Sequence, residues 1–262
     1  MIFYPITAII NALTSITVCV IALTRNPRSQ LNRSFSYFAF SVAFWSYCYF
    51  LWQISNNANS ALFWCRVLMA GAIFIPSTFF HFVCVFLGIF DRKKSIIVYS
   101  YVASLIFFLS DFTPLFIPSV SQKLIFKYFE NFGPMYHPFL IMFAGLTLYS
   151  HYLMFAGFKS ANGAKKNQIK YVFSGTLVGF IGGSTSFFLV YNIPIPPVGN
   201  CLVTIYIIMV AIAIMRHRLM DINLMLTRAG VFITVYPIIL GIPFWIGFKY
   251  LGKGPWIMPV SQ

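Results

Sequence analysis

The sequence predicts an all-α protein, a polytopic helical bundle embedded in a membrane, and three observations support this fold class. Hydrophobic residues make up 60% of the 262 residues and charged residues only 8%, against about 25% charged residues in ordinary globular proteins. Several uncharged runs reach the length of about 20 residues that a bilayer crossing requires. No segment shows the alternating pattern of a membrane β-barrel, so helices must pair the backbone groups within lipid. The uncharged runs are 1–24, 34–65, 67–90, 131–158, 171–215 and 229–248.

The first three spans are expected at residues 2–23, 34–54 and 61–90. Arg25, Arg28 and Arg33 follow the first span, and short loops rich in Lys and Arg stay on the cytoplasmic side. The N-terminus is therefore expected outside the cell. The connection at 56–60 carries no charge, as an outer loop permits. The third span is longer than a perpendicular helix needs, so we expect it to tilt, to kink at Pro76 or to project from the membrane.

The longest polar connection of the chain, 118–137, separates the fourth span from the fifth. Its Lys123, Lys127 and Glu130 leave a net charge of +1, and we interpret it as the largest outer loop. Basic segments come before the fourth span and after the fifth, so both of these connections are expected in the cytoplasm. The two spans are 95–117 and 138–158, and the basic residues are Arg92, Lys93, Lys94, Lys159, Lys165, Lys166 and Lys170.

Two further spans are expected in the uncharged run 171–215, because the segment 192–200 with its three prolines interrupts it near the middle. Thirteen of the 18 lysines and arginines then lie in cytoplasmic connections, so seven transmembrane helices satisfy the positive-inside rule. An eighth apolar stretch, 229–248, would place the C-terminus outside. We therefore divide the chain into a seven-transmembrane region, 1–228, and an eighth apolar segment with a truncated tail, 229–262.

The chain carries few groups that perform catalysis. It contains no phosphate-binding glycine loop, no HExxH, no GxSxG and no ATP-binding sequence, and its cysteines lack the spacing of a metal site. We therefore expect neither an enzyme nor a bound metal or cofactor. The net charge of +14 sits in short loops rather than on one face, which argues against a nucleic-acid partner. The only acidic residues, all in or near predicted loops, are Asp91, Asp111, Glu130 and Asp221.

Trp64, Arg66 and His81 are the candidates for ligand binding. Arg66 follows Trp64 at the predicted outer boundary of the membrane, where both residue types are common for structural reasons. The functional interpretation is an arginine at the mouth of an outward-facing pocket, placed to meet an anionic or polar ligand. His81 is ionisable and lies within a span, and such residues often mark functional sites. A histidine that is hydrogen-bonded inside the bundle is the structural alternative.

The residues alone leave two other functions open. His81 and His151 are both expected in the inner half of the bilayer, and two facing histidines could ligate haem in a membrane subunit. A small transporter or channel is the other alternative, and inverted repeats would favour it. The similarity between the two halves of the chain is slight.

Gly175, Gly179 and Gly183 recur every four residues in the expected sixth span. This spacing places the three glycines on one face of a helix. Small residues at such spacing let a neighbouring helix approach closely, so we predict a helix-packing face here.

Several segments carry a family resemblance. The most specific is Arg216-His217-Arg218-Leu219-Met220-Asp221-Ile222-Asn223, and the segment Lys166-Asn167-Gln168-Ile169-Lys170-Tyr171 and the turn Ile193-Pro194-Ile195-Pro196-Pro197 accompany it. Earlier in the chain, Trp64-Cys65-Arg66 and His81-Phe82 agree with them. On these residues the chain resembles the N-terminal seven-transmembrane sensor region of bacterial sensor histidine kinases, over about residues 1–250.

The resemblance implies a sensory module of a two-component system in the bacterial inner membrane. A small-molecule or membrane-derived signal would pass through the bundle and a coupling junction at Arg216, Arg218 and Asp221 to cytoplasmic output modules. The chain shows no phosphoacceptor helix and no ATP-binding domain. We therefore expect either a truncated sensor or a receptor that works with a separately encoded kinase. A homodimer is also implied, because kinase sensors usually act as dimers.

Overall fold

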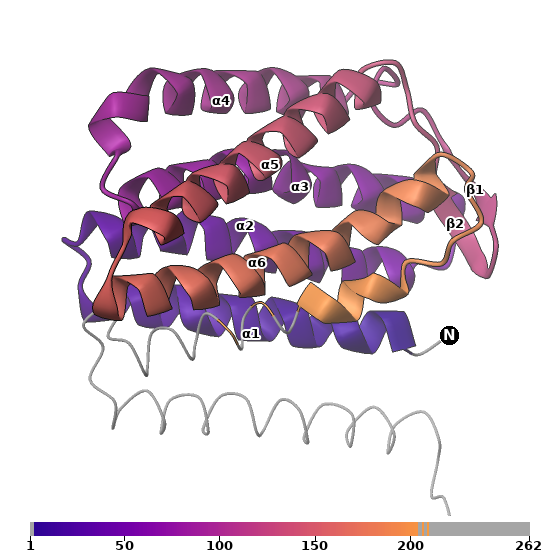
Figure 1. Cartoon of the computed structure of the whole chain (residues 1–262). Helices are drawn as coiled ribbons and strands as arrows, with labels where there is room; N and C mark the ends of the chain where they lie inside the picture. Colours follow the sequence, from indigo (N-terminus) through magenta and orange to yellow (C-terminus); the bar gives the residue numbers. More distant parts are fainter. Residues whose placement is uncertain (1–2, 204–205, 207–208, 210–262) are drawn as a thin grey trace, which may run out of the picture. The chain divides into compact units, whose positions relative to one another are not determined.

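The computed structural model describes residues 3–203, 206 and 209, which form a helical bundle with one short β-hairpin (Figure 1). The α-helices are α1 (Phe3–Arg25), α2 (Gln30–Gln53), α3 (Ala58–Phe86), α4 (Phe90–Asp111), α5 (Tyr136–Ser160) and α6 (Gly163–Val190). The strands are β1 (Val120–Lys123) and β2 (Phe126–Glu130), and a short 3-10 helix, η1 (Val198–Cys201), follows α6.

The six helices lie where the first six spans were expected, and the all-α class of the bundle is confirmed. Five of them, α1, α3, α4, α5 and α6, are long and apolar enough to cross a membrane. α2 has 24 residues, but its serines, tyrosines and tryptophans lower its hydropathy. It packs between α1 and α3 and buries Ser34, Ser36 and Ser46, so protein rather than lipid surrounds much of it. The seventh span beyond residue 209, the boundary at 228 and the segment 229–248 lie outside the described residues.

α3 is the central helix of the bundle, in contact with α2, α4 and α5. In its most apolar stretch 78% of the residues are buried, against 28% in the corresponding stretch of α4. Its aromatic side chains Phe79, Phe80 and Phe82 are fully buried. Pro76 lies within the helix, as the sequence indicated. Other elements of the bundle therefore surround most of α3.

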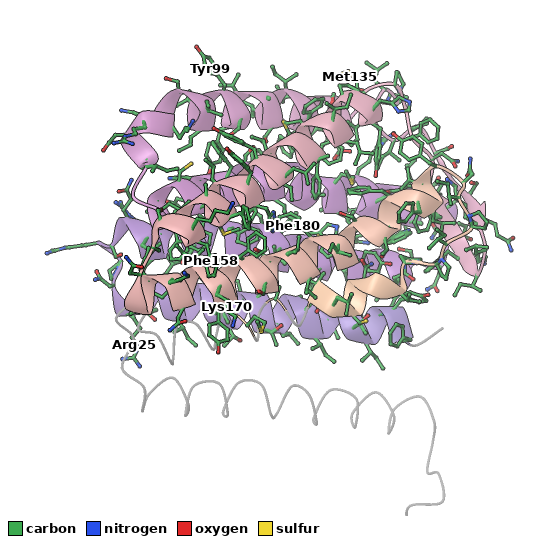
Figure 2. All side chains as sticks on the ribbon, viewed as in Figure 1. Arg25, Tyr99, Met135, Phe158, Lys170 and Phe180 are labelled. Carbon is green, nitrogen blue, oxygen red and sulfur yellow. The ribbon has the colours of Figure 1, made fainter. Side chains whose placement is uncertain are left out.

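The outward faces of α4 and α5 are apolar. Tyr99 projects from α4 with 72% of its surface exposed (Figure 2), and Ile141 and Leu148 on α5 are similarly exposed. Soluble proteins rarely expose so much apolar surface on adjacent helices to water. These faces therefore suit contact with lipid acyl chains.

The segment 118–137, interpreted from the sequence as a loop, contains the antiparallel hairpin of β1 and β2, in which Val120 pairs with Glu130. Leu124 adopts a positive φ of 50° in the turn. Trp52 at the end of α2 donates a hydrogen bond from Nε1 to the Tyr128 carbonyl, over 2.9 Å. The composition of this segment indicates a polar loop, whereas Phe126, Phe129 and Glu130 of β2 are buried. The hairpin is thus a fixed cover on the bundle.

The connections of the bundle sort to two ends (Figure 1). The α1–α2, α3–α4 and α5–α6 connections share one end, which we call the basic end because ten lysines and arginines lie in or beside them. Lys165 on α6 ties this end together by donating from Nζ to the Phe86 carbonyl of α3, over 2.6 Å. The N-terminus, the α2–α3 connection and the hairpin lie at the opposite end, the hairpin end. One-sided positive charge is what the positive-inside rule requires of a membrane bundle.

Candidate functional site

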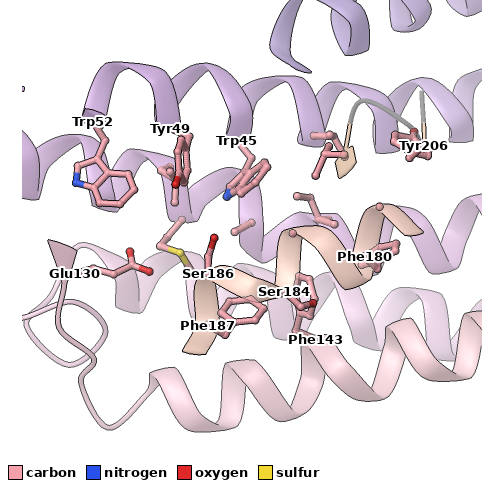
Figure 3. A pocket seen from close by; sticks show the side chains of 18 of the residues that line it. Trp45, Tyr49, Trp52, Glu130, Phe143, Phe180, Ser184, Ser186, Phe187 and Tyr206 are labelled. Carbon is pink, nitrogen blue, oxygen red and sulfur yellow. The ribbon is translucent and has the colours of Figure 1, made fainter. Parts of the chain in front are cut away.

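A narrow cavity of about 80 Å³ runs inside the hairpin end of the bundle, between α2, α3, α5, α6 and β2 (Figure 3). It has room for about six water molecules. Ten of its lining residues are aromatic, and most of the others are aliphatic, glycine or serine. The aromatic residues are Phe38, Trp45, Tyr49, Trp52, Phe129, Tyr136, Phe143, Phe180, Phe187 and Tyr206.

One face of α2 forms the aromatic wall of this cavity. Trp45, Tyr49 and Trp52 are spaced by four and three residues, which places them on the same side of a helix. The rings of Tyr49 and Trp52 meet edge to face with centroids 5.0 Å apart, and Trp52 meets Phe129 of the hairpin at 5.1 Å. Figure 3 shows the three side chains directed toward Glu130 and Ser186. The wall is therefore held in place by ring packing from both α2 and β2.

Glu130 places a carboxyl group at the hairpin end of the cavity. It is the last residue of β2 and only 7% exposed, and it is the one charged residue among the described residues that line the cavity. The Tyr136 hydroxyl donates to its Oε1 over 3.2 Å. Burial raises the pKa of Glu130 to about 7, while the Tyr136 hydrogen bond and the charge of Lys123 act in the opposite direction. The carboxyl therefore changes charge near neutral pH.

Lys123 on β1 does not line the cavity and instead connects the hairpin to α6. Its Nζ donates to the backbone carbonyls of Leu189 and Val190, over 3.3 and 2.9 Å. A lysine at this position satisfies carbonyls that the C-terminus of a helix leaves unpaired. Burial lowers the pKa of Lys123. The contact fastens β1 to the end of α6. The hairpin lysine whose charge acts on Glu130 is therefore already hydrogen-bonded to two backbone carbonyls.

A second buried acid, Asp111, lies at the end of α4. It is 1% exposed, and its Oδ1 has no hydrogen-bond partner among the residues that the structure describes. Arg66 and Glu130 both interact with it electrostatically. Arg66 donates from Nε and Nη2 to the Ile117 carbonyl, over 3.3 and 2.9 Å. Arg66 therefore anchors the segment that leads into the hairpin and compensates part of the charge of Asp111.

The structure does not bring the three predicted ligand residues together. Trp64 is half-buried near the start of α3, where its ring meets Phe63, and neither it nor Arg66 lines the cavity. His81 lies farther along α3, where its Nδ1 is 3.1 Å from the Tyr101 hydroxyl. It lines a separate, more open hollow of about 570 Å³ between α2, α3 and α4. A ligand-binding role for these residues stays a prediction.

The two intramembrane histidines have different surroundings. His151 on α5 has its Nδ1 2.8 Å from the Thr147 carbonyl and its Nε2 3.3 Å from the Thr176 hydroxyl. Its ring packs on Phe79, whereas the ring of His81 packs on Tyr101. Both nitrogens of His151 are thus engaged within the protein, as in the structural alternative for a buried histidine. Within the described part of the chain, no group of three or more His, Cys, Asp or Glu residues could hold a metal ion.

The predicted glycine face lies where α6 meets the residues that follow η1. A Cβ atom on Gly175 would lie 2.6 Å from the Met209 Cβ, and one on Gly179 would lie 2.8 Å from the Tyr206 Cβ. Gly183 leaves more room, with 3.8 Å to the Val203 Cγ2. The predicted coupling residues Arg216, Arg218 and Asp221 lie outside the described residues.

Sequence reasoning missed the buried charges of the hairpin end. The sequence predicts Glu130, Lys123 and Asp111 in or near loops, whereas the structure buries all three. A usable signal was present, because Glu130 directly follows Phe126-Lys127-Tyr128-Phe129 in a chain that has only four acidic residues. A carboxyl group that directly follows a segment with three aromatic residues is an indication of a buried site.

The family described as the N-terminal 7TM region of histidine kinase matches residues 7–223. This chain belongs to that family. No curated protein and no solved structure gives a significant match. The match confirms the resemblance that was drawn from the sequence, and the 7TM region is a non-catalytic part of histidine kinases. With its apolar helices, this 7TM-region chain is a multi-pass membrane protein that contacts the lipid bilayer.

Proposed function

We propose that this chain is the sensory module of a bacterial two-component signalling protein, in the inner membrane with its N-terminus and hairpin end outside. The family match over residues 7–223 carries the proposal. The basic end supports the orientation, because short basic connections are retained in the cytoplasm. The cavity at the hairpin end supports a receptor role, because it would lie nearest to an external signal.

The proposed signal route runs along α6. This helix lines the cavity with Phe180, Ser184 and Phe187, and its glycine face lies against Tyr206 and Met209. A ligand that displaces α6 would therefore act on the residues that precede the junction at Arg216, Arg218 and Asp221. Arginines at a cytoplasmic membrane surface are held by anionic lipids at about 1 kcal/mol each. We propose that a small shift moves this charged segment and alters a kinase on the same or a separate chain.

A kinase chimera tests this function. Residues 1–223 are joined to the cytoplasmic region of a histidine kinase, and autophosphorylation is measured in membrane vesicles at equal protein levels. Ala72→Leu adds three carbons in the cavity, and Ala156→Leu makes the same change on the exposed surface of α5. We expect Ala72→Leu to change the rate about fivefold or more, as allosteric coupling commonly does, and Ala156→Leu to leave it unchanged. Equal rates for Ala72→Leu and the parent chimera would contradict the proposal.

The junction is tested in the same chimera. Replacing Arg216 and Arg218 with glutamine should remove the response to Ala72→Leu, because the charged segment is then no longer held at the membrane surface. Replacing Arg25 and Arg28 with glutamine removes the same charge from the α1–α2 connection and should preserve the response. A response that survives the first pair of substitutions would exclude these arginines as coupling residues.

A further inference from the structure

We propose that the hairpin end of the cavity binds a primary ammonium group that carries a short apolar chain, with the Glu130 carboxylate as its counter-ion. This inference names a ligand class for the proposed receptor and therefore rests on the proposed function. Four features of the cavity carry it.

The first feature is the sign of the charge at the cavity. Glu130 is the one charged residue among the described residues that line the cavity, so a cation is attracted there and an anion is repelled. The charge of Lys123 acts on Glu130, but its Nζ donates its hydrogen bonds to the Leu189 and Val190 carbonyls. Arg66 donates to the Ile117 carbonyl and does not line the cavity. The position for a cation beside Glu130 is therefore not taken by either of these side chains.

The second feature is unused hydrogen-bonding capacity. A carboxylate offers about four acceptor positions, and among the described residues Glu130 receives one side-chain hydrogen bond, from Tyr136. The buried Tyr49 hydroxyl lines the same cavity, with the Asn200 side chain as its polar neighbour, so its oxygen can still accept a hydrogen bond from a ligand. Figure 3 shows this hydroxyl directed into the cavity. A primary ammonium has three donors, so it would pair with the Glu130 carboxylate and with the Tyr49 oxygen together.

The third feature is the aromatic wall around the acid. Trp52, Tyr49, Phe129 and Tyr136 line the cavity together with Glu130. Aromatic faces attract cations, and aromatic walls are a common means of holding ammonium groups. An anionic ligand would not be attracted to the faces of these rings. A neutral alcohol would gain neither the ring attraction nor the charge of Glu130.

The fourth feature is the apolar remainder. On α6 the cavity extends from Phe187 to Thr176, a distance of about 16 Å along the helix axis. Glycine and phenylalanine residues of α6 and aliphatic residues of α3 line most of this stretch, together with the hydroxyl groups of Thr176, Ser184 and Ser186. The cavity volume, equal to about six water molecules, suits a chain of a few carbon atoms. The ligand class is therefore a small alkyl or aralkyl amine, with its charged end under the hairpin.

The test uses hexylammonium with the full chain in lipid nanodiscs. Binding is followed by tryptophan fluorescence, since Trp45 and Trp52 line the cavity, and 1-hexanol and hexanoate serve as ligands with the same chain. We expect saturable binding of hexylammonium that is about tenfold or more tighter than that of either control, because only the ammonium pairs with the buried carboxylate. Absence of saturable hexylammonium binding, or equal affinity for 1-hexanol, would overturn the inference.

Variants locate the site. Glu130→Gln should weaken hexylammonium binding about tenfold or more, and Tyr49→Phe about three- to tenfold, by the loss of one hydrogen bond. Asp91→Asn makes the same acid-to-amide change at an exposed residue of the basic end and should leave the affinity unchanged. Unchanged affinity in both cavity variants would overturn the inference. If Glu130→Gln does not fold, the affinity of Tyr49→Phe and the comparison with 1-hexanol test the inference instead.

The outcome separates this inference from the proposed function. If hexylammonium binds as expected but leaves the kinase chimera unaffected, the ligand site stands and the receptor role is contradicted. If it does not bind while Ala72→Leu still alters the chimera, the ligand class is wrong and the receptor role stands.

Discussion

Glu130 combines three properties that rarely meet in one side chain of a membrane protein: it is acidic, buried and in contact with an internal cavity. Folding removes its carboxyl group from water, and this disfavours the charged form. The titratable groups in electrostatic reach of Glu130 or of its neighbour Asp111 are Tyr49, Cys65, Arg66, Lys123 and Tyr136. Lys123 and Tyr136 offset only part of the burial effect on Glu130.

The pH dependence of stability follows from Glu130. Burial raises the pKa of Glu130 from 4.5 in the unfolded chain to about 7 in the folded protein. The protonated carboxyl group therefore stabilises the folded protein fully below pH 4.5, and this stabilisation is lost as the pH rises through about 7. A difference of this size corresponds to about 3 kcal/mol. We expect the Tm of the protein in nanodiscs to fall between pH 5 and about 8, and Glu130→Gln, which stays neutral, to flatten this fall. Parallel pH profiles for the two proteins would show that Glu130 is not the titrating group.

At the scale of elements, the bundle depends on close contacts between helices. Ser77 of α3 and Ser104 of α4 have their hydroxyl oxygens 2.8 Å apart, and small or polar residues of this kind join helices in lipid. Gly179 allows close packing in another way, because its missing side chain lets Tyr206 approach the backbone of α6. Gly145 on α5, in contrast, has open space where a Cβ would lie. The two glycines therefore differ in their surroundings but share a helical backbone.

Substitution by alanine distinguishes the two glycines. Gly179→Ala would place its Cβ 2.8 Å from that of Tyr206, so we expect a loss of about 1–3 kcal/mol of stability as the helices are forced apart. Gly145→Ala meets nothing and should leave the Tm unchanged or raise it, because alanine favours a helix over glycine by about 1 kcal/mol. Thermal unfolding of both variants in nanodiscs provides the measurement. A tolerated Gly179→Ala would mean that α6 and Tyr206 are not in close contact.

At the scale of the molecule, the sequence predicted the helices of the bundle but not the exact helix ends, the hairpin or the cavity. Uncharged runs located five of the six described helices because the bilayer imposes their length, and the fourth span was expected in a stretch that contains Asp111. The start of the sixth helix was placed too far inward, since Lys165, Lys166 and Lys170 belong to α6 and long basic side chains can still extend to the interface. The third and fourth helices end earlier than expected, at Phe86 and Asp111. The hairpin and the cavity depend on contacts such as Trp52 to Tyr128 and Lys123 to Val190. Such pairs are distant in sequence, and no local pattern encodes them.

In the proposed orientation the cavity faces outward and the coupling junction faces the cytoplasm. Thiol labelling of intact cells with a membrane-impermeant maleimide tests this arrangement most directly. Ser121→Cys places an exposed thiol on the hairpin, and Ser160→Cys places one at the basic end. Both are made with Cys201→Ser, since the other four cysteines are buried. We predict that Ser121→Cys is labelled in intact cells and Ser160→Cys only after permeabilisation. The reverse pattern would contradict the account.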